Sequence, residues 1–275
     1  MRVKEKIKNV PDGRKEHSIP IDVNPENLHD LLVEETKKYN QRVIDADFIE
    51  RWQPYSDDEQ TILYIGALIN TKGMGELLAM APHLILQRPG LKFIFCGFGT
   101  YREHMSQLLN AFEEGDLQKA KTIASTGDFI TEIKIEDFFF KIDKKIKDRI
   151  MLVGYTEHNL LSKILPLCTI CVVPSRLPEA FGMVTVESMA AGVLPICNNH
   201  TGLSDVLDLI EREFPELTSI TRVKKEDFFK NLPQIILELL KFREVYSEGN
   251  QKLKERIRAI SVNNFSWGAI AKKLG

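Results

Sequence analysis

Five short apolar segments, each followed by a helical pattern, constrain the fold of this chain most strongly. They begin at residues 61, 91, 149, 169 and 193 and read TILYIGAL, LKFIFCGFG, RIMLVGY, TICVVPS and VLPICNN. Continuous apolar strands that alternate with helices indicate a parallel sheet covered on both faces. Right-handed crossovers then predict a doubly wound, mostly parallel α/β domain.

The strand–helix rhythm also predicts the domain organisation. Residues 1–55 are polar and proline-punctuated at first and then rich in helix formers, so they are expected to form a linker and a helical arm. Residues 56–275 are expected to form the doubly wound domain. Residues 115–147 exceed what a strand-to-strand connection needs and are predicted to be a helical insertion. Its three phenylalanines, Phe138 to Phe140, are expected to pack locally rather than on another domain.

Charge and hydropathy exclude several classes of protein. The formal net charge of −2 provides no overall attraction to nucleic acid or to an anionic membrane. No run of apolar residues is long enough to span a bilayer, and the first residues lack the apolar stretch of a secretory signal. These features predict a cytoplasmic protein without a transmembrane segment.

The cysteines support the same compartment. Cys96, Cys168, Cys171 and Cys197 all lie in or beside apolar stretches, as reduced core thiols do. Cys168 and Cys171 form a C-x-x-C pair, but no second ligand pair for zinc accompanies it, and it runs directly into a strand. Core packing is therefore favoured over a metal or redox site.

Three loops after the predicted strands carry residues suited to a ligand. Gly66, Lys72 and Gly73 follow the first strand, Gly97, Gly99 and Arg102 follow the second, and the segment SRLPEAFG follows the fourth. The carboxyl ends of parallel strands meet at one edge of a sheet, where ligands of doubly wound folds bind. The sequence therefore predicts a binding site at this edge.

The third loop is the most informative, because a helix is expected to begin near Gly182. The free N–H groups of Gly182, Met183 and Val184, together with the helix dipole, would then suit a diphosphate. Lys72, from the neighbouring loop, would add a positive charge.

Two glutamates flank this helix start. Glu179 lies on the loop before it and Glu187 on the helix itself, in a largely apolar context. Carboxylates accept hydrogen bonds from vicinal hydroxyls, as in dinucleotide-binding folds. One on each side of a diphosphate would suit a ligand with two sugars, such as a nucleotide-sugar. The spacing alone leaves equally open that Glu187 pairs within its helix and that Glu179 is solvated.

The order of these motifs resembles a known family. PEAFGMVTVESMAAGVLPI is similar to the characteristic segment of group 1 (family 4) retaining glycosyltransferases of the GT-B fold. LYIGALINTKG, VGYTEHNLLSKIL, NNHTGLSDVL and FSWGAIAKKL resemble further segments of that family, in the same order. The resemblance covers residues 61–275 and implies the Rossmann-like, donor-binding C-terminal domain of such an enzyme.

The resemblance implies a role for each matching residue. Glu187 would bind the donor ribose, and Glu179 the hydroxyls of the transferred sugar. The diphosphate would be held by Lys72, near Gly66, and by the backbone of Phe181, Gly182, Met183 and Val184. Thr201 and Gly202 would lie near the nucleotide or the sugar. Lys72 and Glu179 are the catalytic candidates, and the donor is a substrate, so no cofactor or metal is expected.

Two features depart from the family pattern. Ala67 stands where the family often has an arginine that contacts the diphosphate, and Arg176 or Arg102 is a candidate to compensate. The sequence before residue 61 also leaves no room for the N-terminal acceptor-binding domain of a complete GT-B enzyme. The chain is therefore expected to supply the donor-binding half and to need that domain or a partner chain.

Two alternative functions stay open. A nucleotide-sugar epimerase of the same fold would bind the same kind of donor. A non-catalytic domain would bind the nucleotide-sugar for a partner chain. Both differ from the expected hexosyltransferase in what happens to the donor after binding.

The remaining motifs are weaker. Asp45 to Asp47 form a D-x-D sequence, but it lies in a charged, helical context rather than after a strand, which favours a solvated face. GFG lacks the third glycine of a dinucleotide fingerprint. His158 and His200 fall near the cleft loops without a pattern that makes either a ligand or a base.

Overall fold

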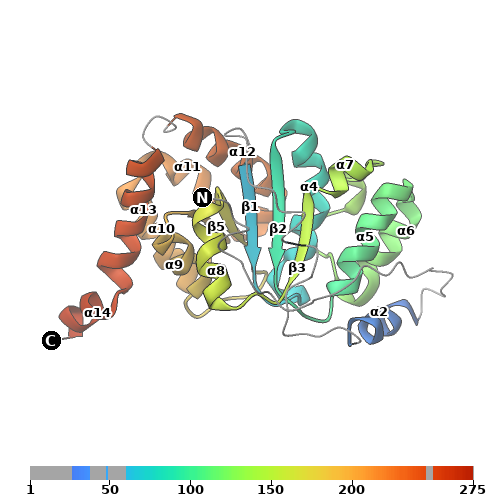
Figure 1. Cartoon of the computed structure of the whole chain (residues 1–275), viewed down its shortest axis with the longest axis horizontal. Helices are drawn as coiled ribbons and strands as arrows, with labels where there is room; N and C mark the ends of the chain where they lie inside the picture. The colour runs from blue at the N-terminus through green and yellow to red at the C-terminus, as the bar shows by residue number, and fades with distance from the viewer. Residues whose placement is uncertain (1–26, 38–47, 49–59, 246–249, 275) are drawn as a thin grey trace. The chain divides into compact units, whose positions relative to one another are not determined.

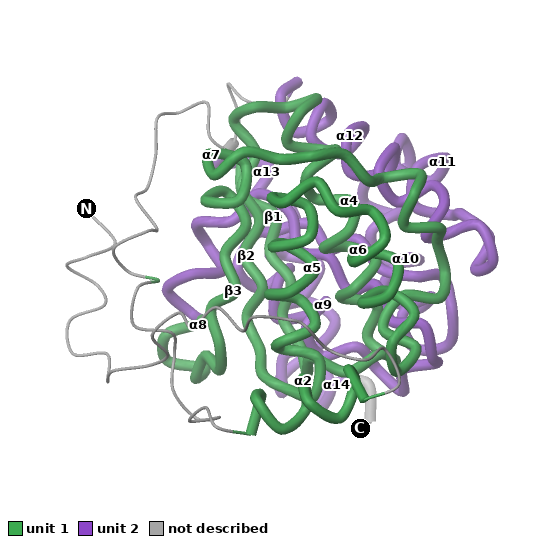
Figure 2. The backbone as a smooth tube through the Cα atoms, turned by 90° about the vertical axis from the view of Figure 1, so that its right-hand side faces the viewer, with its two compact units in different colours: residues 1–161 green, residues 162–275 purple. Residues whose placement is uncertain are grey.

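The computed structural model describes residues 27–37, 48, 60–245 and 250–274. Two compact units divide the chain, residues 1–161 and residues 162–275 (Figure 2). The boundary near residue 55 stays a prediction, because residues 49–59 lie outside the described part.

The first unit holds three strands, β1 (Gln60–Ile65), β2 (Leu91–Cys96) and β3 (Ile150–Gly154) (Figure 1). They pair in parallel in the order β3-β2-β1, with Ile62 opposite Phe93. Most residues of these strands are buried, as is typical of strands in a parallel sheet.

The second unit holds two strands, β4 (Ile170–Val173) and β5 (Leu194–Cys197). They are also parallel, with Ile170 opposite Leu194, and all eight residues are buried. The α/β class and all five predicted strands are thus confirmed.

The first helix of the first unit precedes β1, and most of the others lie in the connections between its strands. They are α2 (Leu28–Lys37), η2 (Asn70–Lys72), α4 (Met74–Gln87), α5 (Arg102–Glu114), α6 (Leu117–Ser125), η3 (Thr126–Asp128), η4 (Ile135–Asp137) and α7 (Lys144–Lys147), and α8 (His158–Ile164) runs across the division. Most of α4 is buried, which its apolar sequence explains.

One short helix of the second unit precedes β4, and the others follow β4 or β5. They are η5 (Leu165–Leu167), α9 (Met183–Ala190), α10 (Gly202–Glu213), η6 (Pro215–Leu217), α11 (Thr218–Thr221), η7 (Lys225–Asp227), α12 (Phe228–Val245), α13 (Asn250–Phe265) and α14 (Trp267–Leu274). Among the described residues, no helix is both long and apolar enough to cross a membrane.

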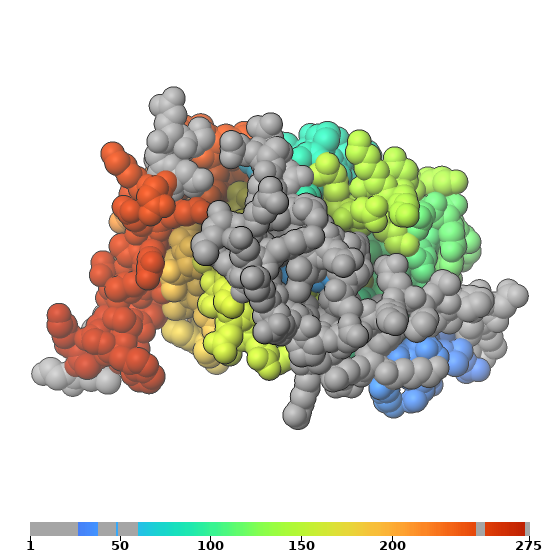
Figure 3. Space-filling view, in the orientation of Figure 1, coloured from blue at the N-terminus to red at the C-terminus, as the bar shows by residue number. Residues whose placement is uncertain are grey.

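Helix α2 of the predicted arm packs on the first unit. It buries Leu28 and Leu32 and contacts α5 and η3. Figure 3 shows α2 in blue at the surface of the molecule. His29 Nδ1 lies 3.1 Å from His104 Nε2 on α5. Tyr101 donates a hydrogen bond to the Gly127 carbonyl and stacks on Phe129 with 5.5 Å between ring centroids. An aromatic cluster therefore joins the arm, α5 and the insertion.

The insertion at 115–147 packs within the first unit. The buried Glu76 carboxylate on α4 accepts hydrogen bonds from the amides of Thr131 (3.1 Å) and Glu132 (3.3 Å). Phe139 stacks on Phe112 of α5 at 5.2 Å, and Phe138 meets His83 of α4 edge-on at 6.0 Å. These contacts agree with the local packing expected for the three phenylalanines.

Helix α13 packs against α9, the helix that carries the candidate site. Ser261 donates a hydrogen bond to the Val186 carbonyl at 3.1 Å. Lys254 donates to the Pro166 carbonyl at 3.1 Å. Arg256 pairs with Glu213 at 2.7 Å and so links α13 to the end of α10. The position of α9 is therefore set by β4, β5 and α13 together.

Candidate functional site

The loop after β4 ends at a glycine whose conformation only glycine adopts readily. Gly182 has φ 68° and ψ 55°, and a Cβ atom there would overlap Leu203 Cδ2. Helix α9 begins at the next residue, as the sequence predicts to within one position. The sharp entry into α9 therefore depends on this glycine.

The start of α9 leaves backbone donors available. The amides of Gly182, Met183 and Val184 have no acceptor among the residues that the structure describes, as expected for a first helical turn. The first amide with a partner is that of Thr185, which donates to the Gly182 carbonyl at 2.9 Å. Three adjacent N–H groups at a helix N-terminus form a binding position for an anion.

Glu179 is held at both its side chain and its backbone. The half-buried carboxylate accepts a hydrogen bond from the hydroxyl of Ser175. The carbonyl accepts from the Thr201 hydroxyl at 2.8 Å and from the Gly202 amide at 3.2 Å. The reading of Glu179 as a freely solvated loop residue is therefore not supported.

Glu187 contrasts with Glu179. It lies in the second turn of α9 and is half-buried. Its carboxylate has no hydrogen bond or ion pair with any residue in the described part of the chain. The intrahelical ion pair that the spacing left open is thus not formed. A partly buried carboxylate that lacks a protein partner is available to a ligand.

The turn after β5 packs directly on the Glu179 loop. Thr201 adopts φ 44° and ψ −130°, a region that β-branched residues rarely occupy. A Cβ atom at Gly202 would overlap the carbonyl oxygen of Ala180, so only glycine allows this approach. Thr201 and Gly202 therefore lie beside Glu179, and both contact its carbonyl.

Ser175 and Asn198, which follow the strand ends, were not singled out from the sequence, and His200 was noted there without a role. Ser175, which follows β4, is buried, and its carbonyl accepts hydrogen bonds from Asn198 Nδ2 at 3.2 Å and from His200 Nε2 at 3.0 Å. Asn198 and His200 follow β5 and are also buried. Their position directly after apolar strands was the only sequence signal available.

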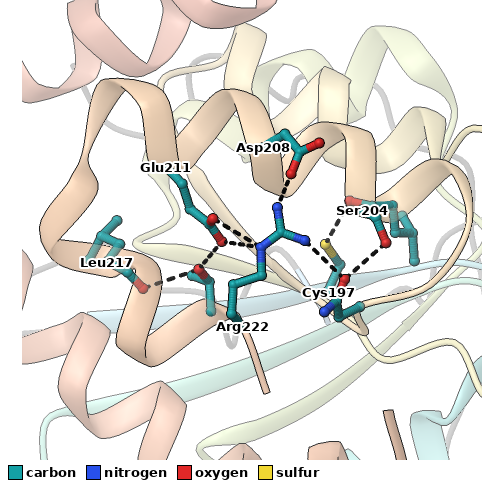
Figure 4. Close-up of polar contacts among 9 residues, drawn as sticks. Cys197, Ser204, Asp208, Glu211, Leu217 and Arg222 are labelled. Carbon is teal, nitrogen blue, oxygen red and sulfur yellow. Dashed lines mark hydrogen bonds and ion pairs between the residues drawn. The ribbon is translucent and has the colours of Figure 1, made fainter. Parts of the chain in front are cut away.

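A charged network fixes the other side of the β5 loop (Figure 4). Arg222 Nε donates to Glu211 of α10 at 2.9 Å, and Nη1 donates to Asn199 Oδ1 at 3.2 Å. Arg222 also pairs with Asp208, and the hydrogen bond with Glu211 is the main cause that raises its pKa. Asn199 also accepts from the Ser204 hydroxyl at 2.9 Å. The network joins the start of α10 to the segment after α11.

Two apolar side chains beside the helix start are exposed. Met183 is 64% exposed, and Phe181, 45% exposed, packs edge-on against Phe265 of α13 with 5.3 Å between centroids. The backbone at these positions, rather than the side chains, is what the resemblance assigns to the diphosphate.

The remaining site candidates belong to the first unit. Gly66 follows β1, its amide donates to the Cys96 carbonyl at 3.1 Å, and a Cβ atom at Gly97 would overlap the Gly66 carbonyl. Lys72 ends η2 and is half-buried. Gly73, with φ 66°, follows Lys72 directly and is the N-cap of α4. The loops after β1 and β2 thus approach each other closely through glycines.

The two arginines considered as substitutes for the residue at Ala67 differ. Arg102 is buried at the start of α5, where it donates to Ser106 Oγ at 2.8 Å and to the Leu152 carbonyl at 3.5 Å. These contacts give it a structural role in the first unit. Arg176 is half-buried in the loop between β4 and α9, close in sequence to Glu179. That Arg176 compensates for the alanine at position 67 stays a prediction.

The cysteines are core thiols, as predicted. All four are buried, and burial raises the pKa of Cys96 and of Cys197 to about 12. Among the described residues, no cluster of three or more His, Cys, Asp and Glu side chains is arranged to hold a metal ion. Asp45 to Asp47 lie outside the described residues, and His158 is exposed at the start of α8.

Comparisons with known proteins point to one family. The family described as glycosyl transferases group 1 matches residues 46–212. The gpi3 subunit of phosphatidylinositol N-acetylglucosaminyltransferase from Schizosaccharomyces pombe is 23% identical over 228 residues, which cover 82% of this chain and 40% of that protein. A glycogen synthase of Thermodesulfovibrio yellowstonii is 26% identical over 214 residues, which cover 77% of this chain and 33% of that protein.

Among solved structures, this chain is similar to a sucrose-phosphate synthase from Thermosynechococcus elongatus, with 22% sequence identity between the two. It matches with a TM-score of 0.49 over 80% of this chain and 45% of that chain. The chain spans less than half the length of the curated relatives it matches.

Proposed function

Because this chain belongs to the glycosyl transferases of group 1, we propose that it binds a nucleotide-diphosphate sugar for transfer of the sugar to an acceptor with retention. One observation carries this proposal. Glu179 and Glu187 flank the glycine-capped start of α9, where three amides have no acceptor among the described residues. This arrangement suits a diphosphate with a hydroxyl-bearing sugar on each side.

Each site residue has a proposed role. Glu187 accepts hydrogen bonds from the ribose hydroxyls and Glu179 from hydroxyls of the transferred sugar. The backbone from Phe181 to Val184 binds the diphosphate. Lys72, near Gly66, adds positive charge to the diphosphate, and Thr201 and Gly202 lie near the nucleotide or the sugar.

The proposed chemistry rests mainly on stabilising the leaving group. Negative charge develops on the nucleotide diphosphate as its bond to the sugar breaks, and the α9 amides and Lys72 stabilise that charge. The acceptor hydroxyl attacks from the same face, so the configuration at the sugar is retained. The base that takes its proton lies in the acceptor-binding half or is the leaving phosphate itself.

We further propose that this chain supplies the donor-binding half of the enzyme. The matches cover only 40% and 33% of the two relatives named above. A separate acceptor-binding domain or partner chain then completes the active site.

A thermal-shift screen tests the binding proposal. UDP-glucose, UDP-N-acetylglucosamine, ADP-glucose and GDP-mannose are each added to the chain. A donor at about 100 times its Kd stabilises the folded state by about 2.7 kcal/mol. A screen in which none of these compounds raises the Tm contradicts the proposal.

The Glu187→Ala variant tests the ribose contact. Loss of hydrogen bonds to a charged group is expected to weaken donor binding about tenfold or more. Glu238→Ala is the matched control, because Glu238 is a half-buried glutamate on α12 that pairs with Gln234 at 2.7 Å. Equal donor affinity of the two variants contradicts the role of Glu187.

A further inference from the structure

The hydroxyl of Ser175 bears directly on one of the two glutamates. It donates to Glu179 Oε1, and Ser175 itself is 1% exposed. A buried donor fixed on one carboxylate oxygen restricts rotation of that carboxylate, because turning it would leave the hydroxyl without an acceptor. Ser175 therefore sets the direction in which Glu179 presents its other lone pairs.

Ser175 is in turn fixed by the β5 loop. Its carbonyl accepts from Asn198 Nδ2 at 3.2 Å and from His200 Nε2 at 3.0 Å. A carbonyl only accepts hydrogen bonds, so Nε2 of His200 carries a proton. Both donor side chains are buried, so neither contact is exchanged readily for water.

The same loop also holds the backbone of Glu179. The Thr201 hydroxyl and the Gly202 amide donate to the Glu179 carbonyl at 2.8 and 3.2 Å. Thr201 retains a strained backbone, with φ 44°, while it makes this contact. Glu179 is thus attached to the β5 loop at its backbone and, through Ser175, at its side chain.

We propose that Ser175 is a positioning residue for Glu179, held in place by Asn198 and His200, and that this arrangement determines how the transferred sugar binds. The inference rests on the proposed function, since it needs a sugar at Glu179. Its consequence is selective. The hydrogen bonds orient the group that meets the sugar and leave the amides of α9 and Glu187 unchanged. Binding of the sugar should therefore depend on Ser175, while binding of the nucleoside diphosphate should not.

The experiment compares two ligands on each variant. Calorimetry measures the Kd of UDP, ADP or GDP and of its sugar conjugate, with the pair chosen by the thermal-shift screen. Ser175→Ala is expected to raise the Kd of the nucleotide-sugar about tenfold and to leave that of the nucleoside diphosphate unchanged. Thr36→Val is the control, because Thr36 is also buried and its hydroxyl donates to the Leu32 carbonyl within α2 at 2.9 Å, outside the proposed site.

A second pair of variants covers the case in which Ser175→Ala does not fold. His200→Leu removes the donor to the Ser175 carbonyl, and His200→Gln keeps an N–H donor. His200→Leu should weaken nucleotide-sugar binding selectively, and His200→Gln should restore most of it.

Three results would overturn the inference. An unchanged Kd of the nucleotide-sugar in Ser175→Ala and His200→Leu removes the positioning role. An equal loss for both ligands reduces these residues to structural support. Failure of the unmodified chain to bind any of the four nucleotide-sugars rejects the proposed function and this inference together. Because that failure is seen without any substitution, the two cases are distinguishable.

Discussion

Gly182 is the residue on which the entry into α9 depends. Its φ of 68° is in the left-handed region, and a Cβ atom would overlap a side chain of α10. Any other residue must either strain the backbone or move Leu203, which packs in the core of the second unit. The residue therefore links packing of α10 to the geometry of the candidate site.

Gly182→Ala should lower the free energy of unfolding by about 1–3 kcal/mol and weaken donor binding, because strain and overlap displace the α9 amides. Denaturant unfolding and the thermal-shift assay measure the two effects. Gly268→Ala is the control, since a Cβ atom at Gly268 in α14 meets nothing within 4 Å. Helix propensity favours alanine there, so the control should be neutral or slightly stabilising. Similar effects at both positions would refute the argument.

His104 makes stability depend on pH. Burial, and secondarily the charge of His29, lower its pKa from 6.5 to about 3. The folded state therefore excludes a proton that the unfolded state takes up below pH 6.5. The contribution of neutral His104 to the free energy of unfolding is complete above pH 6.5 and is lost progressively as the pH falls toward 3.

The expected loss from His104 is about 2 kcal/mol between pH 7 and pH 5. Urea unfolding of the unmodified protein and of His104→Leu at both pH values measures it. Carboxylates contribute equally to both proteins, so the difference between their pH dependences isolates His104. The same slope in both proteins would show that the imidazole is not held neutral.

At the scale of elements, one carboxylate on α4 binds the insertion at residues 115–147 by hydrogen bonds. Glu76 is fully buried on α4, and its Oε1 accepts from two consecutive amides of the insertion. Thr131 and Glu132 are exposed residues, and their amides would face water without the Glu76 carboxylate. Burial of Glu76 is thus compensated by hydrogen bonds that a methyl group cannot supply.

Glu76→Ala should destabilise the protein by about 1–3 kcal/mol, because two amides lose their acceptor and a cavity forms. Glu76→Gln retains one acceptor oxygen and should lose less. Hydrogen exchange at the amides of Thr131 and Glu132 should accelerate in Glu76→Ala before it does elsewhere in the first unit. Uniform acceleration would mean that Glu76 supports the whole unit rather than the insertion.

At the scale of the whole molecule, donor binding and transfer are expected to separate. The chain matches less than half of its relatives' length, and the proposed site supplies groups for the donor only. Residues 1–275 should therefore bind the nucleotide-sugar without efficient transfer to an added acceptor. Product formation measured with radiolabelled donor tests this, with an intact donor expected after incubation. Robust transfer by this chain alone would refute the half-enzyme proposal, and a released sugar epimer would favour the epimerase.

Several features of this protein follow from the sequence because they depend on local patterns. The apolar runs predict all five strands, since parallel strands buried on both faces need continuous apolar sequence. The start of α9 is predicted from Gly182, because a helix entry of this kind requires a residue that tolerates positive φ. The buried cysteines follow from their apolar neighbours in the same way.

The supporting contacts of the site were decided only by the tertiary structure. Ser175, after β4, lies more than twenty positions before Asn198 and His200, which follow β5. Ordinary polar residues after a strand carry no local pattern that would predict such a contact. The same holds for Arg222, whose partners Asp208 and Glu211 lie on another helix.

Glu179 and Glu187 show which properties of the site the sequence determines and which the folded structure decides. Their spacing in the sequence places one before the α9 start and the other within the helix, because helical geometry is local. Whether either carboxylate is engaged depends on chain segments brought together by folding. The structure attaches Glu179 to Ser175 and to the β5 loop and leaves Glu187 without a partner among the described residues. Sequence alone thus determined where these groups lie along the chain, and long-range packing decided which of them is held and which is available.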